Sequence, residues 1–507
     1  MRWVLIRPLN QSLFFDPEIQ EPLGLEYLAS VLIGLGCKVL IMDSALDNLN
    51  DTKLARRAVS FNPDAVGFSI TTNRELHSVE AIYAEIKKTG REIFWIAGGN
   101  YVTTEYHNAV DKLPDEMRLM KYEGEQSMKE IFSLWRNGSL FSLPRYIEGI
   151  NTTNLDELPF PQRPFHHYLK NFGWAYNLQG SRGCCSACKY CASKGMRGHL
   201  LNWRGRTPEN MVNEVLHLYE NYSARAFNFV DEDFLGPPRH AAERAQRFSS
   251  AIIRNKLHIT FGIQVRPNSL SREVIDSLAE AGLKYVFMGI ESDEPDDFKI
   301  WGRQYCEHTW QYVEMLQDKE IEINAGTLLF HPQCSYQGMR RFAGKLHQYG
   351  LFNSRTATNR LDAMPGSFFY NEYMEANPHI KPSGFVQLPF RQPEIEPFFS
   401  TIYNVLAPLE APSMYALCLM PIIQTRRFID NVQESFFRLK EINYSCDQQV
   451  AKCFFSLLDM FENGKNNDSV IRELTEENKQ FGKMIANNLY THRLLTSKEI
   501  LYKTIEQ

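Results

Sequence analysis

Residues 180–191 read GSRGCCSACKYC and bring four cysteines together, at Cys184, Cys185, Cys188 and Cys191. The apolar segment at 175–179 predicts a strand directly before them, so we expect the cysteines on the loop at its carboxyl end. The chain has 507 residues and only 10 cysteines, which are too few for a disulfide-bonded scaffold. In a reducing compartment, cysteines spaced this closely indicate a metal site.

The spacing Cys184-x3-Cys188-x2-Cys191 is compatible with two kinds of metal site. Three thiolates on one loop can bind three irons of a [4Fe–4S] cluster and leave the fourth iron open to a chelating small molecule. A structural zinc site would need a fourth protein ligand, and His199 is the nearest one. Spacing alone leaves both open, as well as thiols that bind no metal, so the choice depends on the surrounding sequence.

Upstream of the cysteines, predicted strands and helices alternate. Apolar runs at 2–7, 38–42, 64–70 and 92–97 predict strands, and residues 22–35 carry apolar side chains with helical spacing. This βαβαβαβ pattern predicts an α/β fold with a parallel, doubly wound, Rossmann-like sheet. Such sheets bind ligands at the carboxyl ends of their strands, which here are residues 8–12, 71–73, 98–101 and 123–127.

Downstream, a proline-rich segment separates this sheet from a second alternation. Pro144, Pro159, Pro161 and Pro164 disfavour helix interiors and central strands, so we interpret residues 141–170 as a linker. Thr207 with Pro208, and later Ser271, are typical of helix starts. The predicted strands are 175–179, 226–230, 259–265, 285–290, 323–330 and 355–361, which makes a partial (β/α)6 barrel rather than a complete one.

The last part of the chain, residues 376–507, differs in composition from both of the segments in which strands and helices alternate. Eight prolines occur between Pro378 and Pro421, and none follows, which predicts a mainly helical end. The predicted domains are therefore 1–140 (Rossmann-like), 141–170 (linker), 171–375 (partial barrel) and 376–507 (helical).

Composition argues against several classes of partner. The chain is 44% apolar, and 55 Lys and Arg face 60 Asp and Glu, so there is no basic excess to attract nucleic acid or an anionic membrane. No uncharged apolar run approaches the ~18 residues of a membrane span, and MRWVLIRPLN lacks the pattern of a signal peptide. We expect a cytoplasmic protein without a membrane span or a nucleic-acid partner.

The cysteine motif, with Tyr190 before its last cysteine and a place after the first strand of a partial βα barrel, resembles that of the radical S-adenosylmethionine (SAM) superfamily. Further segments resemble the cobalamin (B12)-dependent, methyltransferase-like (class B) branch, in the expected order over about residues 2–375. They are PLGLEYLASVL (22–32), NPDAVGFSITT (62–72), WIAGGNYV (95–102) and KYEGEQSMKEI (121–131) for its cobalamin-binding domain, LDELPFPQRP (155–164) for its linker, and FVDEDFL (229–235), FMGIES (287–292) and AMPGSFFYNEY (363–373) for its barrel.

The resemblance implies roles for individual residues around the cluster and SAM. Cys184, Cys188 and Cys191 would bind a [4Fe–4S] cluster whose open iron takes SAM, and Cys185 departs from the motif without being expected to ligate. Tyr190 would lie near the adenine or pack beneath the cluster. Glu291 would bind the ribose or the amine of SAM, or alternatively pair with Arg266, and Asp231 and Arg266 would belong to the same cofactor pocket.

For the first domain, the resemblance implies a cobalamin site at the strand ends. Its predicted residues are Ser69, Thr71, Thr72, Asn73, Gly98, Gly99, Asn100, Glu123 and Gly124, with the glycines allowing close approach of the backbone to the corrin. The alternative is a doubly wound domain in which Gly98-Gly99 is only a tight turn. The loop RPLNQS (7–12) has no histidine, so the cobalt is expected to have no histidine ligand from it.

The implied function is methylation of an unactivated carbon of a small-molecule or peptide substrate. A 5′-deoxyadenosyl radical would take a hydrogen atom, methylcobalamin would donate the methyl group, and a reductase or flavodoxin-type protein would supply electrons. The alternatives are a radical rearrangement, cyclisation or ring contraction, a radical SAM enzyme with a vestigial B12 domain, and a cofactor-binding sensor. Phe398, Phe399, Tyr403, Met414 and Met420 would let the tail cap the barrel mouth, unless the tail only packs.

Overall fold

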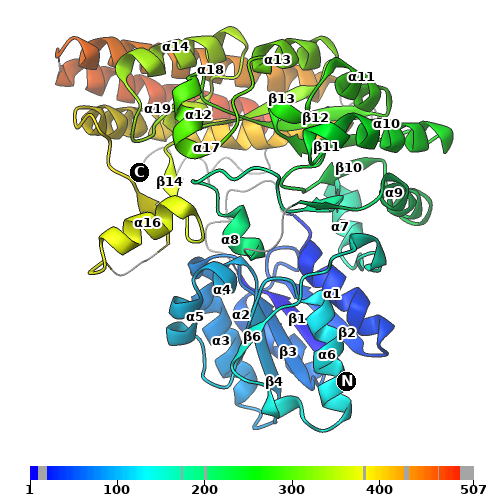
Figure 1. Ribbon diagram of the computed structural model, residues 1–507. Coiled ribbons are helices and arrows are strands. Elements are labelled where there is room, and N and C mark those ends of the chain that lie inside the picture. The colour runs from blue at the N-terminus through cyan, green and yellow to red at the C-terminus, as the bar shows by residue number, and fades with distance from the viewer. Residues whose placement is uncertain are drawn as a thin grey trace. The chain divides into compact units, whose positions relative to one another are not determined.

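The computed structural model describes residues 1–9, 20–172, 175–198, 203–380, 384–426, 433–465 and 467–491, without the side chains of 171, 172, 415, 417–426 and 433. The chain forms two compact units (Figure 1). Unit 1 comprises Met1–Ala224 and Met364–Val386, and unit 2 comprises Arg225–Ala363 and Gln387–Gln507. Met364–Val386 therefore belongs to unit 1, although the segments before and after it in the sequence belong to unit 2.

Unit 1 is built on a parallel sheet, as predicted. Its strands are β1 (Arg2–Arg7), β2 (Lys38–Asp43), β3 (Ala65–Ser69), β4 (Phe94–Gly98), β5 (Arg118–Lys121) and β6 (Tyr146–Glu148). They pair in the order β2-β1-β3-β4-β5-β6, with Trp3 opposite both Val39 and Ala65. Strand β6 lies within the segment interpreted as a linker, so the sheet extends past residue 140.

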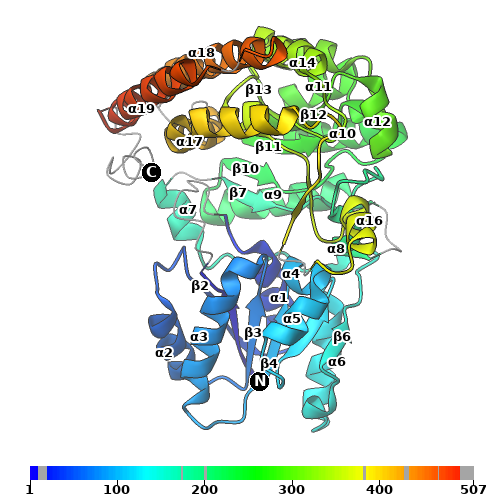
Figure 2. The same ribbon diagram turned by 90° about the vertical axis from the view of Figure 1, so that its left-hand side faces the viewer.

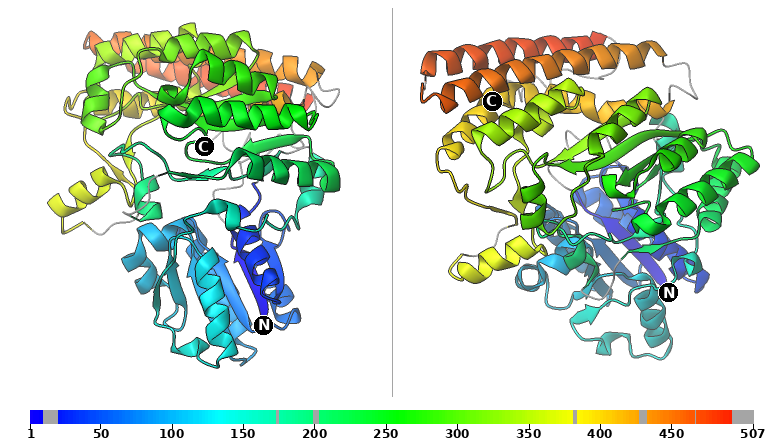
Figure 3. Two further views of the ribbon diagram at one scale, coloured as in Figure 1. Left: turned by 45° about the vertical axis from the view of Figure 1, so that its right-hand side comes forward. Right: turned by 45° about the horizontal axis from the view of Figure 1, so that its top comes forward.

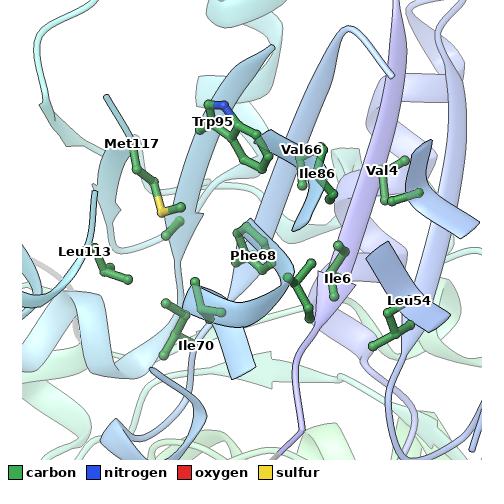
Figure 4. Packing of buried hydrophobic residues seen from close by; sticks show 14 of the residues in the cluster. Val4, Ile6, Leu54, Val66, Phe68, Ile70, Ile86, Trp95, Leu113 and Met117 are labelled. Carbon is green, nitrogen blue, oxygen red and sulfur yellow. The ribbon is translucent and has the colours of Figure 1, made fainter. Parts of the chain in front are cut away.

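Helices cover both faces of this sheet, which is why its central strands are apolar along almost their whole length. Helices α1 (Leu23–Gly34) and α6 (Glu125–Arg136) pack on one face. The other face carries α2 (Asp51–Ser60), α3 (Leu76–Lys87), α4 (Asn100–Thr104) and α5 (Tyr106–Lys112). Figure 4 shows the second core, where Phe68 stacks on Trp95 with ring centroids 6.4 Å apart.

The rest of unit 1 carries the cysteine motif. It contains the short 3-10 helices η2 (Asn73–Glu75), η3 (Leu140–Ser142) and η4 (Leu155–Glu157), then α7 (His166–Phe172), β7 (Tyr176–Leu178), β8 (Ser181–Arg182), α8 (Ser193–Arg197), β9 (Arg204–Gly205), α9 (Pro208–Tyr222) and α16 (Phe368–Ala376), with β15 (Val386–Gln387) at the unit boundary. Strands β8 and β9 pair antiparallel, with Arg182 opposite Arg204. The segment between β8 and α8, residues 183–192, is called the cysteine loop below.

Unit 2 contains a second parallel sheet with helices after its strands. The strands are β10 (Ala226–Phe229), β11 (Thr260–Val265), β12 (Leu283–Glu291) and β13 (Glu322–Thr327), each paired with the next. The helices are α10 (Pro238–Arg254), α11 (Arg272–Glu280), α12 (Pro295–Trp301), α13 (Thr309–Asp318) and α14 (Tyr336–Gln348). Ser271 caps α11 by accepting a hydrogen bond from the Val274 N–H, as its position predicts.

The predicted strand at 355–361 is wrong, because this segment begins as helix α15 (Ser354–Thr358). Asn353 accepts a hydrogen bond from the Thr356 N–H, and the Thr356 hydroxyl accepts one from the Asn353 N–H. This capping box satisfies two amides locally and outweighs the strand preference of the threonines. Within 355–361 only an isolated bridge between Arg360 and Phe330 is strand-like, and strand β14 (Asp362–Ala363) follows the segment.

The helical tail is confirmed and begins earlier than the proline-free segment. Helix α17 (Ile395–Arg426) runs through Pro408 and Pro412, and α18 (Gln433–Glu462) and α19 (Asp468–Thr491) pack against it (Figures 2 and 3). Packing on neighbouring helices stabilises α17 despite the missing proline N–H groups. Among the described residues, no helix has the length and apolarity that a bilayer span requires.

Candidate functional site

The cysteine loop presents its thiols at different depths. Cys184 and Cys188 are half-buried, whereas Cys185 and Cys191 are exposed. The turn between the last two motif cysteines is closed by a hydrogen bond of 3.1 Å from the Cys191 N–H to the Cys188 carbonyl. Exposure therefore does not distinguish Cys185 from the three motif cysteines, because Cys191 is exposed as well.

Backbone and hydroxyl groups of the loop lie against the sulfur atoms. The Ser186 N–H lies 3.4 Å from Cys184 Sγ, the Ser193 N–H lies 3.5 Å from Cys191 Sγ, and Ser186 Oγ lies 3.0 Å from Cys188 Sγ. Among the described residues, no three His, Cys, Asp or Glu side chains already stand in a metal-binding arrangement. The three thiols share a loop whose amides can stabilise thiolates bound to iron.

Both arginines at the base of the cysteine loop are held by Glu123, at the end of β5. Arg182 Nη1 lies 3.0 Å from Glu123 Oε2, and Arg204 Nη2 lies 2.5 Å from Oε1. Arg182 also pairs with Glu125 at 2.6 Å. Burial would raise the pKa of Glu123, but the hydrogen bond from Arg204 and the two positive charges hold it below its usual value. This carboxylate fixes the cysteine loop to the sheet, and its contact with cofactor stays a prediction.

Helix α8, at the end of the cysteine loop, lies on the carboxyl edge of the unit 1 sheet. It packs on α4, and Asn151 Nδ2 donates a hydrogen bond of 3.2 Å to the Arg197 carbonyl. A Cβ built on Gly195 would come within 2.4 Å of the Gly366 carbonyl oxygen, so only glycine fits where these two segments of the chain touch. The Phe369 N–H completes the contact by donating to the Lys189 carbonyl at 3.0 Å. The cysteine loop and the ligand edge of the sheet are thus neighbours within one unit.

The strand-end residues predicted to bind cobalamin divide into accessible and engaged positions. Thr71, Thr72, Asn73 and Asn100 are exposed at the edge, with Ser69 and Gly98 half-buried beside them. The Thr71 hydroxyl donates to Glu75 at 2.5 Å and keeps its lone pairs as hydrogen-bond acceptors.

Two of the predicted glycines serve internal packing. Gly99 has φ +104°, and a Cβ there would lie 2.4 Å from the Ile70 carbonyl oxygen. A Cβ on Gly124 would meet Leu28 and Met120 at 3.0 Å. These glycines let the β4–α4 turn and α6 pack against neighbouring segments, a requirement that exists without any corrin.

The loop after β1 is described only as far as Leu9. Asn10, Gln11 and Ser12 lie outside the described residues, as does His199, which was the alternative zinc ligand. Arg7, the last residue of β1 before this loop, pairs with the buried carboxylate of Asp43. The side chain of Met420, named for the tail, also lies outside the described residues.

In unit 2, the residues predicted to bind SAM follow β10, β11 and β12. Asp231 is buried, and Arg266 pairs with Asp233 at 2.8 Å. Glu291 pairs with Arg303 at 2.5 Å, so the expectation that its salt-bridge partner would be Arg266 is wrong. A Cβ on Gly289 would come within 2.7 Å of Glu291 Oε1, so a larger residue at this position would displace the ion pair.

Sequence reasoning missed several charged partners of the site, namely Arg182, Arg204, Glu125 and Arg303. Arg182 and Arg204 carried only a weak signal, because they flank the cysteine motif in a segment that also contains Lys189, Lys194, Arg197 and Arg206. Arg303 carried none, since nothing distinguishes it from the other arginines before the fold is known.

Comparison with known families identifies two domains in the chain, and the second of them spans residues of both compact units. The B12 binding domain family matches residues 17–132, and the Radical SAM superfamily matches residues 178–338. The chain combines a B12-binding domain with a radical SAM domain. Its cofactors are accordingly cobalamin, SAM and a [4Fe–4S] cluster, which favours the cluster over zinc.

The curated relatives of this radical SAM protein are distant. A protein named as an uncharacterized methyltransferase of Pyrococcus horikoshii is 26% identical over 56% of the chain and 63% of its own length. The anaerobic magnesium-protoporphyrin IX monomethyl ester cyclase of a Synechocystis species is 23% identical over 58% and 61%. The cytidylyl-2-hydroxyethylphosphonate methyltransferase of Streptomyces wedmorensis is 24% identical over 54% and 62%. The chain thus spans about three-fifths of the length of these relatives.

Solved structures support the same fold. The cobalamin-dependent SAM radical enzyme OxsB, with aqua-cobalamin bound, has a TM-score of 0.74 at 15% identity, covering 100% of this chain and 83% of its own. The radical SAM methyltransferase TsrM of Kitasatospora setae, with cobalamin and a [4Fe–4S] cluster bound, has a TM-score of 0.59 at 15% identity over 74% and 75%. At these identities the likeness shows the fold alone.

The residues present fit the cofactors by their chemistry. Three thiols on one loop, with N–H groups directed at two of the sulfurs, suit three irons of a cluster. Exposed hydroxyl and amide side chains at the strand ends suit the polar periphery of a corrin.

Proposed function

We propose that this protein methylates an unactivated carbon of a small-molecule or peptide substrate. The observation that supports this most strongly is the contact between the cysteine loop and the carboxyl edge of the B12-binding sheet within unit 1. A radical formed at one cofactor must reach a substrate that also lies near the other, so the two sites need to be neighbours.

When bound, the cluster supplies the electron that splits SAM into methionine and a 5′-deoxyadenosyl radical, and methylcobalamin supplies the methyl group that replaces the hydrogen atom taken from the substrate. We assign Cys184, Cys188 and Cys191 to the cluster. An electron donor of the reductase or flavodoxin type, with a second SAM, would restore the cofactors.

The chain's own residues bind and orient these groups. Ser69, Thr71, Thr72, Asn73, Gly98 and Asn100 are proposed to contact cobalamin, and Tyr190, Asp231 and Glu291 to contact SAM. Glu123 and its two arginines hold the cysteine loop against the cobalamin edge. The loop after β1 has no histidine in its sequence, so bound cobalamin should lack a nitrogen ligand from it.

The first experiment tests the cluster. Anaerobic reconstitution should give about four irons and four sulfides per chain, and reductant with SAM should release 5′-deoxyadenosine. Replacing Cys184, Cys188 and Cys191 together by alanine should abolish both signals, whereas Cys185→Ala should keep them. Stoichiometric zinc in protein purified without air would contradict the proposal.

The second experiment separates methyl transfer from its main rival. The relative named as a cyclase favours a second candidate function, a radical cyclisation or rearrangement without methyl transfer. With SAM deuterated in its methyl group, label in the product supports methylation. A product that forms with 5′-deoxyadenosine but without label would establish the second candidate.

A further inference from the structure

Glu291 has an unusual backbone conformation at the end of β12. Its φ is +65°, in the left-handed region that a residue with a side chain adopts only at an energetic cost. The register between β12 and β13 also shifts between Gly289 and Glu291. Such strained residues persist only where the surrounding structure fixes the chain on both sides, and they concentrate at functional sites.

On the amino-terminal side, strand pairing fixes the chain. Gly289 lies opposite Gly326 in the ladder between β12 and β13, and the Leu328 N–H donates to the Glu291 carbonyl at 2.7 Å. The left-handed turn directs the Glu291 carboxylate back over Gly289, where it meets Arg303.

On the carboxyl-terminal side, a buried polar chain fixes Ser292. The Ser292 hydroxyl donates to Asp297 Oδ2 at 2.5 Å and accepts from the Glu294 N–H at 3.1 Å. His331 Nε2 lies 3.3 Å from the same Asp297 oxygen. Ser292, Asp297 and His331 are each at most 7% exposed, so the chain of contacts is shielded from water.

His331 is itself held in place from several sides. Its ring packs edge-on against Trp301 with centroids 5.1 Å apart, and its Nδ1 lies 3.3 Å from Gln333 Oε1. The Cys334 N–H donates to the His331 carbonyl at 3.0 Å. His331, Gln333 and Cys334 line a cavity of about 260 Å³ beside the carboxyl ends of β12 and β13. The imidazole therefore links the loop after β13 to the loop after β12.

We propose that Asp297 and His331, acting through Ser292, are positioning residues that hold Glu291 in its left-handed conformation and so keep its carboxylate directed at SAM. The inference rests on the proposed function, in which Glu291 contacts SAM. Without the buried contacts, Glu291 would relax to an ordinary conformation and its carboxylate would leave the place over Gly289.

The test measures SAM binding to the reconstituted holoprotein by equilibrium dialysis with labelled SAM. His331→Leu, Asp297→Ala and Ser292→Ala should each raise the Kd for SAM about ten-fold, which matches the cost of a left-handed residue. His331→Gln should restore most of the affinity, because its amide can donate to Asp297 from nearly the same place. Asp296→Ala is the matched control on the same helix, since Asp296 is exposed and pairs with the exposed Lys299, and it should leave the Kd unchanged.

A double-mutant cycle separates positioning from general damage to the fold. In a Glu291→Ala background, His331→Leu should change the Kd less than two-fold, because the carboxylate it positions is gone. Additive effects, or an unchanged Kd in all three single variants of a protein that binds SAM, would overturn the inference. If His331→Leu does not fold, Ser292→Ala, which removes one hydroxyl, carries the same cycle. A wild-type holoprotein that binds no SAM would refute the proposed function and this inference with it.

Discussion

At the scale of single residues, Gly99 shows how a site residue can be required for packing. Its φ of +104° and ψ of −178° lie in a region essentially confined to glycine. The backbone on either side is tied to β3, since the Ile70 N–H donates to the Gly98 carbonyl and the Tyr101 N–H donates to the Ile70 carbonyl. Any side chain at this position would push the two segments apart.

We therefore expect Gly99→Ala to destabilise the protein whether or not cobalamin is present. The loss should be about 2 kcal/mol or more in the free energy of unfolding, measured by urea denaturation. Gly98→Ala is the matched control, because its Cβ would lie 3.4 Å from the Met120 carbonyl, an ordinary contact. Equal stability of the two variants would show that the turn is not held as described.

At the scale of elements, the carboxylate of Glu123 anchors both of the paired strands β8 and β9. Glu123→Gln should weaken the attachment of both arginines and lower the free energy of unfolding by about 3 kcal/mol, the usual cost of breaking a buried ion pair. Glu148→Gln, an exposed carboxylate at the end of β6, should change it by less than about 0.5 kcal/mol.

The pH dependence of this anchor has a definite sign. Because the folded protein lowers the pKa of Glu123, its contribution is fully present above the usual pKa of a glutamate and is lost as the pH falls through the lowered value. The difference between wild type and Glu123→Gln should therefore shrink in acid. A difference that grows as the pH falls would contradict the ion-pair assignment.

The tail helices form part of the core of unit 2. Phe454 of α18 is fully buried, with ring centroids 5.6 Å from Phe398 of α17 and 5.1 Å from Phe352. This packing supports a structural role for the tail, and deletion of α18 and α19 would expose an apolar core. Capping of the barrel mouth by the tail stays a prediction.

Phe454→Ala should lower the free energy of unfolding by about 3–5 kcal/mol, because it leaves a cavity among aromatic rings. Phe437, on the same helix, is 59% exposed, and Phe437→Ala should cost less than about 0.5 kcal/mol. Thermal unfolding of the two variants side by side measures the difference. A tolerant Phe454→Ala variant would mean that the tail contributes little to unit 2.

At the scale of the whole molecule, a buried charge network joins the segments of unit 1. Arg163, in the predicted linker, pairs with Glu21 before α1 at 2.9 Å and with Glu214 of α9 at 3.0 Å. Glu214 also pairs with Arg206, and Glu26 lies 3.5 Å from Arg163. Three carboxylates thus share two guanidinium groups, and burial, followed by the charge of Glu21, raises the pKa of Glu26 well above its usual value.

This imbalance predicts opposite results for two similar substitutions. Glu214→Gln should cost about 3 kcal/mol of unfolding free energy, since it deprives two buried arginines of their shared partner. Glu26→Gln should be neutral or stabilising, because it removes the surplus negative charge.

The pH dependence of these variants provides the check. A raised pKa means that the contribution of Glu26 is present at low pH and is lost as the pH rises. Urea unfolding at about pH 5 and about pH 8 should show a smaller loss of stability in Glu26→Gln than in wild type. A strongly destabilised Glu26→Gln variant would mean that Glu26 is ionised in the folded protein.

The sequence by itself determined the two parallel βα arrays and the cysteine loop after the first strand of the second array. Apolar periodicity and motif spacing are local properties, so β1 begins and ends where the run at 2–7 predicted. The segment at 355–361 was misread because a capping box, also local, outweighed its strand-like residues.

Only the tertiary structure decided which charged groups meet. Glu123 lies at a predicted strand end, but its partner Arg204 is 81 residues away along the chain, and any arginine could have served. The same holds for Glu291, whose partner proved to be Arg303 and not Arg266. Ion pairs and glycine contacts depend on distances that exist only after the sheets have closed, whereas strands and helices follow from the pattern of neighbours along the chain.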